Sequence, residues 1–182
     1  SEEETAEETQ KESAAENREQ KKQDAQEETV QEPKSEEIET QAAATAYLNP
    51  HTGVDSNDGS TEATAVRTLD KAMQLAGNGG TIYISSVITI TSNKELSDVT
   101  IKRFPSATWG TSILQVKEGA TLTLRNVIVD GTESMKQFGI EVIEGSHLIL
   151  EGTTKICNNI ETAVVINENS SVVMNSGEIG AN

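Results

Sequence analysis

The stretch that decides the fold is VKEGATLTLRNVIVDG, Val116 to Gly131, because its pattern of residue types recurs twice more along the chain. The pattern returns in VIEGSHLILEGTTKICNN (142–159) and in INENSSVVMNSGEIGAN (166–182). The apolar positions and the Gly or Asn positions are retained, whereas most polar residues change. A repeat of this kind indicates that one short unit is stacked several times.

Pairs of apolar residues separated by one residue define the strands of the repeat, since both members of such a pair point to the same side of a strand. The first series, with steps of 26, 26 and 24 residues, contains Ile88/Ile90, Leu114/Val116, Ile140/Val142 and Val164/Ile166. The second series, with steps of 23, 26 and 24 residues, contains Val99/Ile101, Leu122/Leu124, Leu148/Leu150 and Val172/Met174. A weaker third series contains Ile82/Ile84, Ile128, Ile156 and Ile179.

Three short strands in each turn of about 25 residues favour a parallel β-helix. Helical repeats would show an apolar spacing of about 3.6 residues, which this region lacks. An antiparallel meander gives no reason for a constant offset between equivalent strands. Winding each turn onto the previous one places equivalent aliphatic residues in one interior file, about 4.8 Å apart. We therefore expect an all-β fold whose core consists of these files.

Glycine and asparagine, which tolerate positive φ better than other residues, recur between the predicted strands. One corner contains Gly119, Gly145 and Asn169, and another contains Gly131, Asn159 and Asn182. We expect the backbone to turn sharply, with positive φ, at both corners.

Composition divides the chain into three segments. Residues 1–45 contain 15 Asp or Glu against 5 Lys or Arg and few large apolar residues, which predicts a disordered acidic spacer, with a solvated helix as the alternative. Residues 46–80 contain a loop and a capping helix, from about Thr68 to Ala76, that ends at Gly77 and has one apolar face. Residues 81–182 form the β-helix turns. Because they stop directly after a corner without a cap, we expect them to belong to a longer protein.

The segment NPHTGVDSNDGSTEATAVRTLDKAMQLAGNGGTIYI (49–84), followed by TLTLRNVIVDG (121–131), resembles the start of right-handed parallel β-helix proteins of the pectin-lyase-like superfamily. VVMNSGEIGAN (172–182) resembles a coil motif of large Gram-positive surface proteins. The resemblance covers about residues 46–182 and implies a right-handed parallel β-helix with an N-terminal capping helix. It is unspecific for function, because the superfamily includes polysaccharide lyases, glycoside hydrolases, adhesins and phage tailspikes.

Candidate ligand-binding residues lie on the predicted outward faces. We expect Lys102, Arg125 and Glu151 to be vertical neighbours that form an ion-pair ladder or, alternatively, contact a sugar acid. Trp109, the only tryptophan, is expected on a loop, where it packs beneath the loop or stacks on a sugar ring. His147 is expected to point into solvent. No pair of acidic residues falls on one predicted file, so no catalytic residues are identified.

Asp55, Asn57 and Asp58 in DSNDGS resemble the front of a calcium loop. A twelve-residue loop from Asp55 would end at Val66, where an EF-hand needs a glutamate. An Asx-type turn is the other reading, so Ca²⁺ is only a possible cofactor. Cys157, the only cysteine, is expected to be a packing residue.

Charge and composition narrow the class of function. The net charge of −16 argues against nucleic-acid binding, and no apolar run approaches the roughly 18 residues of a membrane span. We expect an extracellular bacterial protein, secreted or attached to the cell wall, that acts in adhesion or binds host or environmental glycans or proteins. The alternative is the non-catalytic N-terminal part of a polysaccharide lyase or other large secreted hydrolase.

Overall fold

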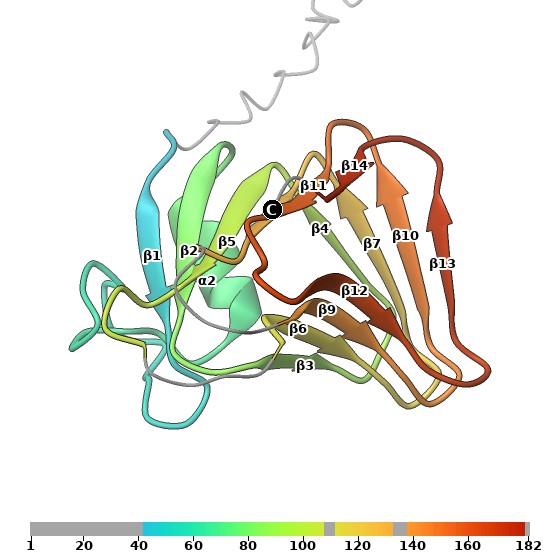
Figure 1. The fold of residues 1–182 in the computed structure, drawn as a ribbon. Coiled ribbons are helices and arrows are strands. Elements are labelled where there is room, and N and C mark those ends of the chain that lie inside the picture. The colour runs from blue at the N-terminus through green and yellow to red at the C-terminus, as the bar shows by residue number, and fades with distance from the viewer. Residues whose placement is uncertain (1–41, 108–111, 133–137, 181–182) are drawn as a thin grey trace, which may run out of the picture. The chain divides into compact units, whose positions relative to one another are not determined.

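The computed structural model describes residues 42–107, 112–132 and 138–180 (Figure 1). These residues form a parallel β-helix, made of three parallel sheets and one short helix, which confirms the predicted fold class. No helix in these three ranges is long and apolar enough to cross a membrane. The acidic spacer was predicted over residues 1–45, and its residues 1–41 lie outside the described part of the chain.

Three sheets, here called A, B and C, form the walls of the β-helix. Sheet A contains, in spatial order, β1 (Thr45–Leu48), β2 (Gly80–Ile84), β5 (Val99–Arg103), β8 (Ile128–Asp130), β11 (Lys155–Cys157) and β14 (Glu178–Ile179). Sheet B contains β3 (Ile88–Ile90), β6 (Leu114–Val116), β9 (Phe138–Val142) and β12 (Thr162–Ile166). Sheet C contains β4 (Lys94–Ser97), β7 (Thr121–Arg125), β10 (His147–Glu151) and β13 (Ser171–Met174). From β3 onward the chain visits sheets B, C and A in that order on every turn.

The first predicted apolar series is confirmed in sheet B. Ile90 pairs with Val116, Val116 with Val142, and Val142 with Ile166, all in parallel register. Val116 and Val142 are fully buried. Strands of three to five residues suffice here because each one is paired with a neighbouring turn, and the inner strands β6 and β9 are paired on both sides.

The second predicted series is correct from its second member onward and wrong at its first. Leu124 pairs with Leu150 in sheet C, as predicted, but its partner in the preceding turn is Leu96. Ile101 instead lies in sheet A, where it pairs with Ile82. The error arises because only Asp98, with φ of 56°, separates β4 from β5. Two strands of different sheets therefore follow one another almost without a gap.

The third predicted series contains one wrong residue. Ile156 of β11 pairs with Val129, which is fully buried, whereas Ile128 pairs with Lys155 and is only half-buried. Two adjacent β-branched residues are equally good candidates by composition. Only the register with the neighbouring turn shows which one faces the core.

The corner between sheets B and C has the predicted conformation. Gly119, Gly145 and Asn169 have φ of 74°, 73° and 60°. Turn hydrogen bonds close each of these corners, for example from Ser146 N to Ile143 O at 3.1 Å. Positive φ favours Gly and Asn here, which explains why the repeat retains them.

The corner between sheets A and B was predicted for the wrong reason. Gly131 and Asn159 do not have positive φ, whereas Thr132 and Asn158 do, at 65° and 55°. Gly131 is required by space, because a Cβ atom there would lie 2.1 Å from the carbonyl oxygen of Asn158. Asn159 is buried and donates from Nδ2 to Cys157 O at 2.8 Å. Asn182 lies outside the described residues.

The helix α2 (Leu69–Ala76) agrees with the prediction. Thr68 is the N-cap, with Oγ1 accepting from Lys71 N at 3.2 Å, and Gly77 ends the helix with φ of 63°. Ala72 and Ala76 are fully buried in the apolar core that the helix shares with the strands. Beyond the prediction, residues 45–48 form β1, which covers the outer edge of β2.

At the opposite end, β12 and β13 have apolar residues that are open to solvent. Ile166 is 49% exposed and Met174 is 53% exposed, although both occupy inward positions of their files. No strand among the described residues pairs with the far edges of β12 and β13.

The stacked core predicts a contrast between neighbouring positions of β7. Leu124→Ala should lower the free energy of unfolding by about 2–5 kcal/mol, because it leaves a cavity between Leu96 and Leu150. Thr123→Ala, on the outward side, should change it by less than about 0.5 kcal/mol. Urea denaturation followed by circular dichroism measures both. Equal effects of the two substitutions would contradict the inward assignment of Leu124.

Candidate functional site on the outer face of sheet A

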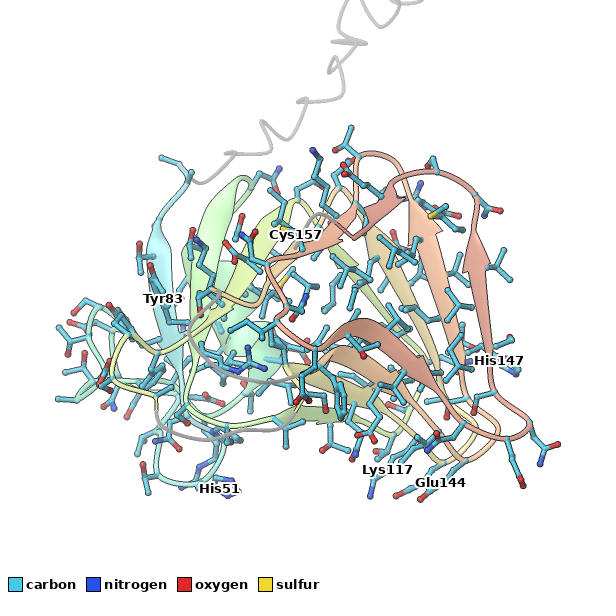
Figure 2. The ribbon with its side chains drawn as sticks, viewed as in Figure 1. His51, Tyr83, Lys117, Glu144, His147 and Cys157 are labelled. Atoms are coloured by element: carbon cyan, nitrogen blue, oxygen red, sulfur yellow. The ribbon has the colours of Figure 1, made fainter. Side chains whose placement is uncertain are left out.

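A row of chemically distinctive side chains follows the outward face of sheet A. The row, here called the tyrosine file, is set by the strand register and contains Tyr47, Tyr83, Lys102, Asp130 and Cys157. Each residue comes from a different strand, so neighbours in the file are 19 to 36 positions apart in the sequence. Figure 2 labels Tyr83 and Cys157 at two positions along this face.

Aromatic rings occupy the first part of the tyrosine file. Tyr47 and Tyr83 are stacked, with ring centroids 5.2 Å apart and planes inclined by 22°. Phe104 contacts Tyr47 edge to face at 5.4 Å and is itself buried. The chain has five Phe, Trp and Tyr residues in all, and this cluster contains three of them.

An ion pair follows the rings. Lys102 Nζ lies 2.7 Å from Asp130 Oδ2, and the Asp130 side chain is only 12% exposed. Asp130 Oδ1 also accepts hydrogen bonds from Thr132 N at 2.9 Å and from Asn158 Nδ2 at 3.0 Å. Partial burial alone would raise the pKa of Asp130, but the hydrogen bonds from Lys102, Asn158 and Thr132 outweigh burial and lower it. The pair is therefore charged at neutral pH.

A concavity of about 230 Å³ lies beside these groups, lined in part by Tyr83, Lys102, Phe104 and Thr132. Arg103 is buried beneath this region and donates to Gly131 O and to Phe138 O, both at 3.3 Å. Burial lowers the pKa of the Arg103 guanidinium to about 10, so it too stays protonated at neutral pH. The site thus combines an aromatic surface, an ion pair and a shallow hollow.

The tyrosine file offers binding groups rather than an activated nucleophile. Burial raises the pKa of the Cys157 thiol, and Asp130 nearby raises it further, so the reactive thiolate is disfavoured. Cys157 is half-buried on the outward face and forms no disulfide, and its expected packing role stays a prediction.

The predicted ladder of Lys102, Arg125 and Glu151 is only partly formed. Arg125 forms ion pairs with Glu151 at 2.6 Å and with Glu95 at 3.1 Å, across three strands of sheet C. Lys102 is not their neighbour, because β5 belongs to sheet A rather than sheet C. This error follows directly from the misplaced Val99/Ile101 pair. Arg125 is 49% exposed, as expected for a surface ladder of small energetic value.

The residues of the DSNDGS segment are used within their own loop. Asp55 accepts hydrogen bonds from Arg67 N and Thr68 N at 2.8 and 2.9 Å, which lower its pKa, and Asp58 accepts from Ser60 N at 3.0 Å. Asn57 donates from Nδ2 to Ala65 O at 3.0 Å. Only the contact between Asp58 and Ser60 is that of an Asx turn, whereas Asp55 joins the front of the segment to the start of α2. In the three described ranges no group of three His, Cys, Asp or Glu side chains is placed to hold a metal ion. A calcium site here stays a prediction.

The remaining candidates lie apart from the tyrosine file. Trp109 falls outside the described residues. His147 is exposed, as predicted, and its Nδ1 lies 2.8 Å from Ser171 Oγ. A hydrolytic triad uses Nε2 for the serine and Nδ1 for a carboxylate, so this contact has the wrong geometry for such a triad. Figure 2 places His147 and Glu144 near the corner between sheets B and C, on a different side from Tyr83.

A pair of acidic residues lies off the predicted strand files. Glu118 and Glu144 occupy the corner between sheets B and C on successive turns, where Glu118 N donates to Glu144 Oε2 at 3.3 Å. Both are corner residues with positive φ, of 60° and 55°. The predicted files covered strand positions only, so this pair was overlooked.

Comparison with known proteins identifies no relative: the chain matches no protein-family model, no curated protein and no solved structure. What is established is the class of fold, a parallel β-solenoid of about three turns.

Sequence reasoning missed the tyrosines, although the signal was present. Tyr83 lies between Ile82 and Ile84, and Tyr47 lies between Ala46 and Leu48, so strict alternation turns both rings outward. Their mutual contact could not be found in this way, since 36 residues and α2 separate them.

The Asp130 interactions predict a specific pH dependence. The folded state lowers the pKa of Asp130, so its stabilising effect is fully present above the unfolded pKa, about 3.9, and is lost progressively as the pH falls below that value and through the lower folded pKa. We expect the free energy of unfolding of the wild type to decrease more between about pH 5 and pH 3 than that of Asp130→Asn. Urea titrations at several pH values measure this difference.

The matched control is Glu161→Gln, which removes an exposed carboxylate that does not belong to the tyrosine file. This variant should keep the pH dependence of the wild type. Identical pH profiles for Asp130→Asn and the wild type would show that the carboxylate is not stabilised by its partners.

Proposed function

We propose that this chain is the β-helix region of an extracellular bacterial protein and that it binds glycans through the tyrosine file. The single observation that carries the proposal is the stack of Tyr47 and Tyr83 directly followed by the Lys102–Asp130 ion pair. A pyranose ring has an apolar face that packs on an aromatic ring, and its hydroxyl groups accept from lysine and donate to a carboxylate.

The dimensions of the site support a short segment of polysaccharide. Successive strands of sheet A follow at about 4.8 Å, so the four residues from Tyr47 to Asp130 extend over roughly 14 Å. The concavity beside Tyr83 and Lys102 has space for part of a sugar unit. A shallow site built on rigid strands favours binding without large rearrangement.

Membership of the pectin-lyase-like superfamily, and of its Gram-positive surface proteins, forms part of the same proposal. The parallel β-helix, the capping helix α2 and the segment from Asn49 to Ile84 support it. Binding without catalysis is favoured because the carboxylate in the file is held as an ion pair and the thiol is not activated. Adhesion to a glycan-bearing surface is the role that this chemistry fits.

The test is a glycan array followed by titration of any bound glycan. Tyr83→Ala should weaken binding by about tenfold, because it removes the ring next to Lys102. Tyr83→Phe keeps the ring and should retain affinity within about threefold. Thr123→Ala, on the outward face of sheet C, is the control and should bind as the wild type does.

Two outcomes would overturn the proposal. One is the absence of binding to every glycan on the array, and the other is binding that Tyr83→Ala leaves unchanged while the variant keeps the thermal midpoint of the wild type. Incubation with uronic-acid polymers tests the alternative, since an increase in ultraviolet absorbance from unsaturated product would identify a lyase.

A further inference from the structure

The first strand of sheet B has an open edge. Sheet B ends at β3, which pairs with β6 on one side and with no other described strand on the opposite side. Ile88 N donates to Ile113 O and Ile90 O accepts from Lys117 N, so the main-chain groups of these two residues point toward the next turn. The N–H and C=O of Thr89 alternate with them and point outward. An edge of this kind can pair with another extended chain.

A groove of about 440 Å³ runs along this edge. Residues 87–92 form one wall, and Pro50, His51, Arg67 and Thr68 contribute to the other. The accessible apolar part of the lining includes Leu69 and Val87, which are both half-buried. Figure 1 shows β3 as the first strand of its sheet, and Figure 2 shows His51 on the loop that follows β1. The volume falls within the range of ligand-binding clefts.

The polar lining of the groove is cationic, although the chain as a whole is strongly acidic. Arg67 donates from Nε to Gly53 O at 2.8 Å and forms no ion pair within the described residues. Lys94 pairs with Asp70 at 2.6 Å, but Asp70 is 80% exposed and the contact is one that solvent weakens. Asp55 accepts from Thr68 N and Arg67 N, where it caps α2, and its charge also attracts the exposed Arg67 guanidinium.

We propose that this groove binds an extended peptide from another molecule, one that has apolar residues and a carboxylate side chain. The peptide adds a strand to sheet B by pairing with Thr89, its apolar side chains lie against Leu69 and Val87, and its carboxylate pairs with Arg67. Strand addition uses main-chain hydrogen bonds for affinity and alternate side chains for specificity. None of the described Phe and Tyr residues lines the groove, in contrast to the tyrosine file, so the two surfaces fit different partners.

Titration by nuclear magnetic resonance, with the full chain labelled with ¹⁵N, tests the proposal. The probe is the peptide acetyl-Val-Glu-Val-Thr-Val-amide, and its matched control has Gln in place of Glu. We expect saturable shifts of the Thr89 and Thr91 amides with the Glu peptide and about tenfold weaker binding of the Gln peptide, because a charge-assisted hydrogen bond to Arg67 is lost.

Two variants locate the contacts. Arg67→Gln should weaken binding of the Glu peptide by about tenfold and should make the two peptides bind equally. Thr89→Pro removes the outward N–H without affecting the bonds to β6, and proline is tolerated on an edge strand. This variant should keep the wild-type circular dichroism spectrum and lose peptide binding. Arg125→Gln, on sheet C, is the control and should bind both peptides as the wild type does.

Several results would overturn the inference. One is the absence of a saturable shift with either peptide up to about 5 mM, a concentration that would largely saturate a site with a Kd of about 1 mM. Another is equal binding of both peptides by the wild type. A third is peptide binding that survives in a folded Thr89→Pro variant. Concentration-dependent self-association that Arg67→Gln abolishes would also overturn it, since the occupant would then be a second copy of the chain. If Thr89→Pro does not fold, the loss of discrimination between the two peptides in Arg67→Gln still tests the proposal.

Discussion

The parallel register between successive turns is the constraint on which the rest of this structure depends. Val116 lies against Val142, and Leu124 against Leu150, because each strand donates and accepts main-chain hydrogen bonds from its neighbours in the next turn. A strand of three to five residues has no independent stability, so a turn is stable only when other turns lie against it. The aliphatic files and the hydrogen-bond ladders therefore form together or not at all.

The corners between the sheets let the chain follow the same path through sheets B, C and A on every turn. Asp98 and Asn126 both have φ of 56° between sheets C and A, and Asn126 Nδ2 donates to Asp98 Oδ1 at 2.9 Å. The same amide accepts from Thr153 N of the following turn at 3.0 Å through its oxygen. A single residue with positive φ thus turns the chain, while its side chain links three turns. Corner side chains in this protein stabilise the stack as well as changing the chain direction.

Side chains at outward positions do not pack in the core, so they can be polar, charged or aromatic and can contact a ligand. On sheet A, this freedom places two tyrosines beside an ion pair, and on sheet C it gives a surface ladder around Arg125. The groove at β3 has a different origin, since it exists where α2 and the preceding loop meet the open edge of sheet B. The two surfaces proposed for binding are thus independent consequences of one architecture.

The sequence by itself determined the repeat, the inward file of sheet B, the capping helix and the positive-φ residues at Gly119 and Gly145. These features depend on local alternation and on residue type, which are readable along the chain. Only the tertiary structure decided that Leu96, rather than Ile101, precedes Leu124, and that Lys102 joins Tyr83 and Asp130. The physical reason is that register between turns depends on how many residues each corner uses. The number of residues in a corner is set by packing against the neighbouring turns. The same alternation of apolar and polar residues is therefore compatible with several ways of pairing the strands of successive turns.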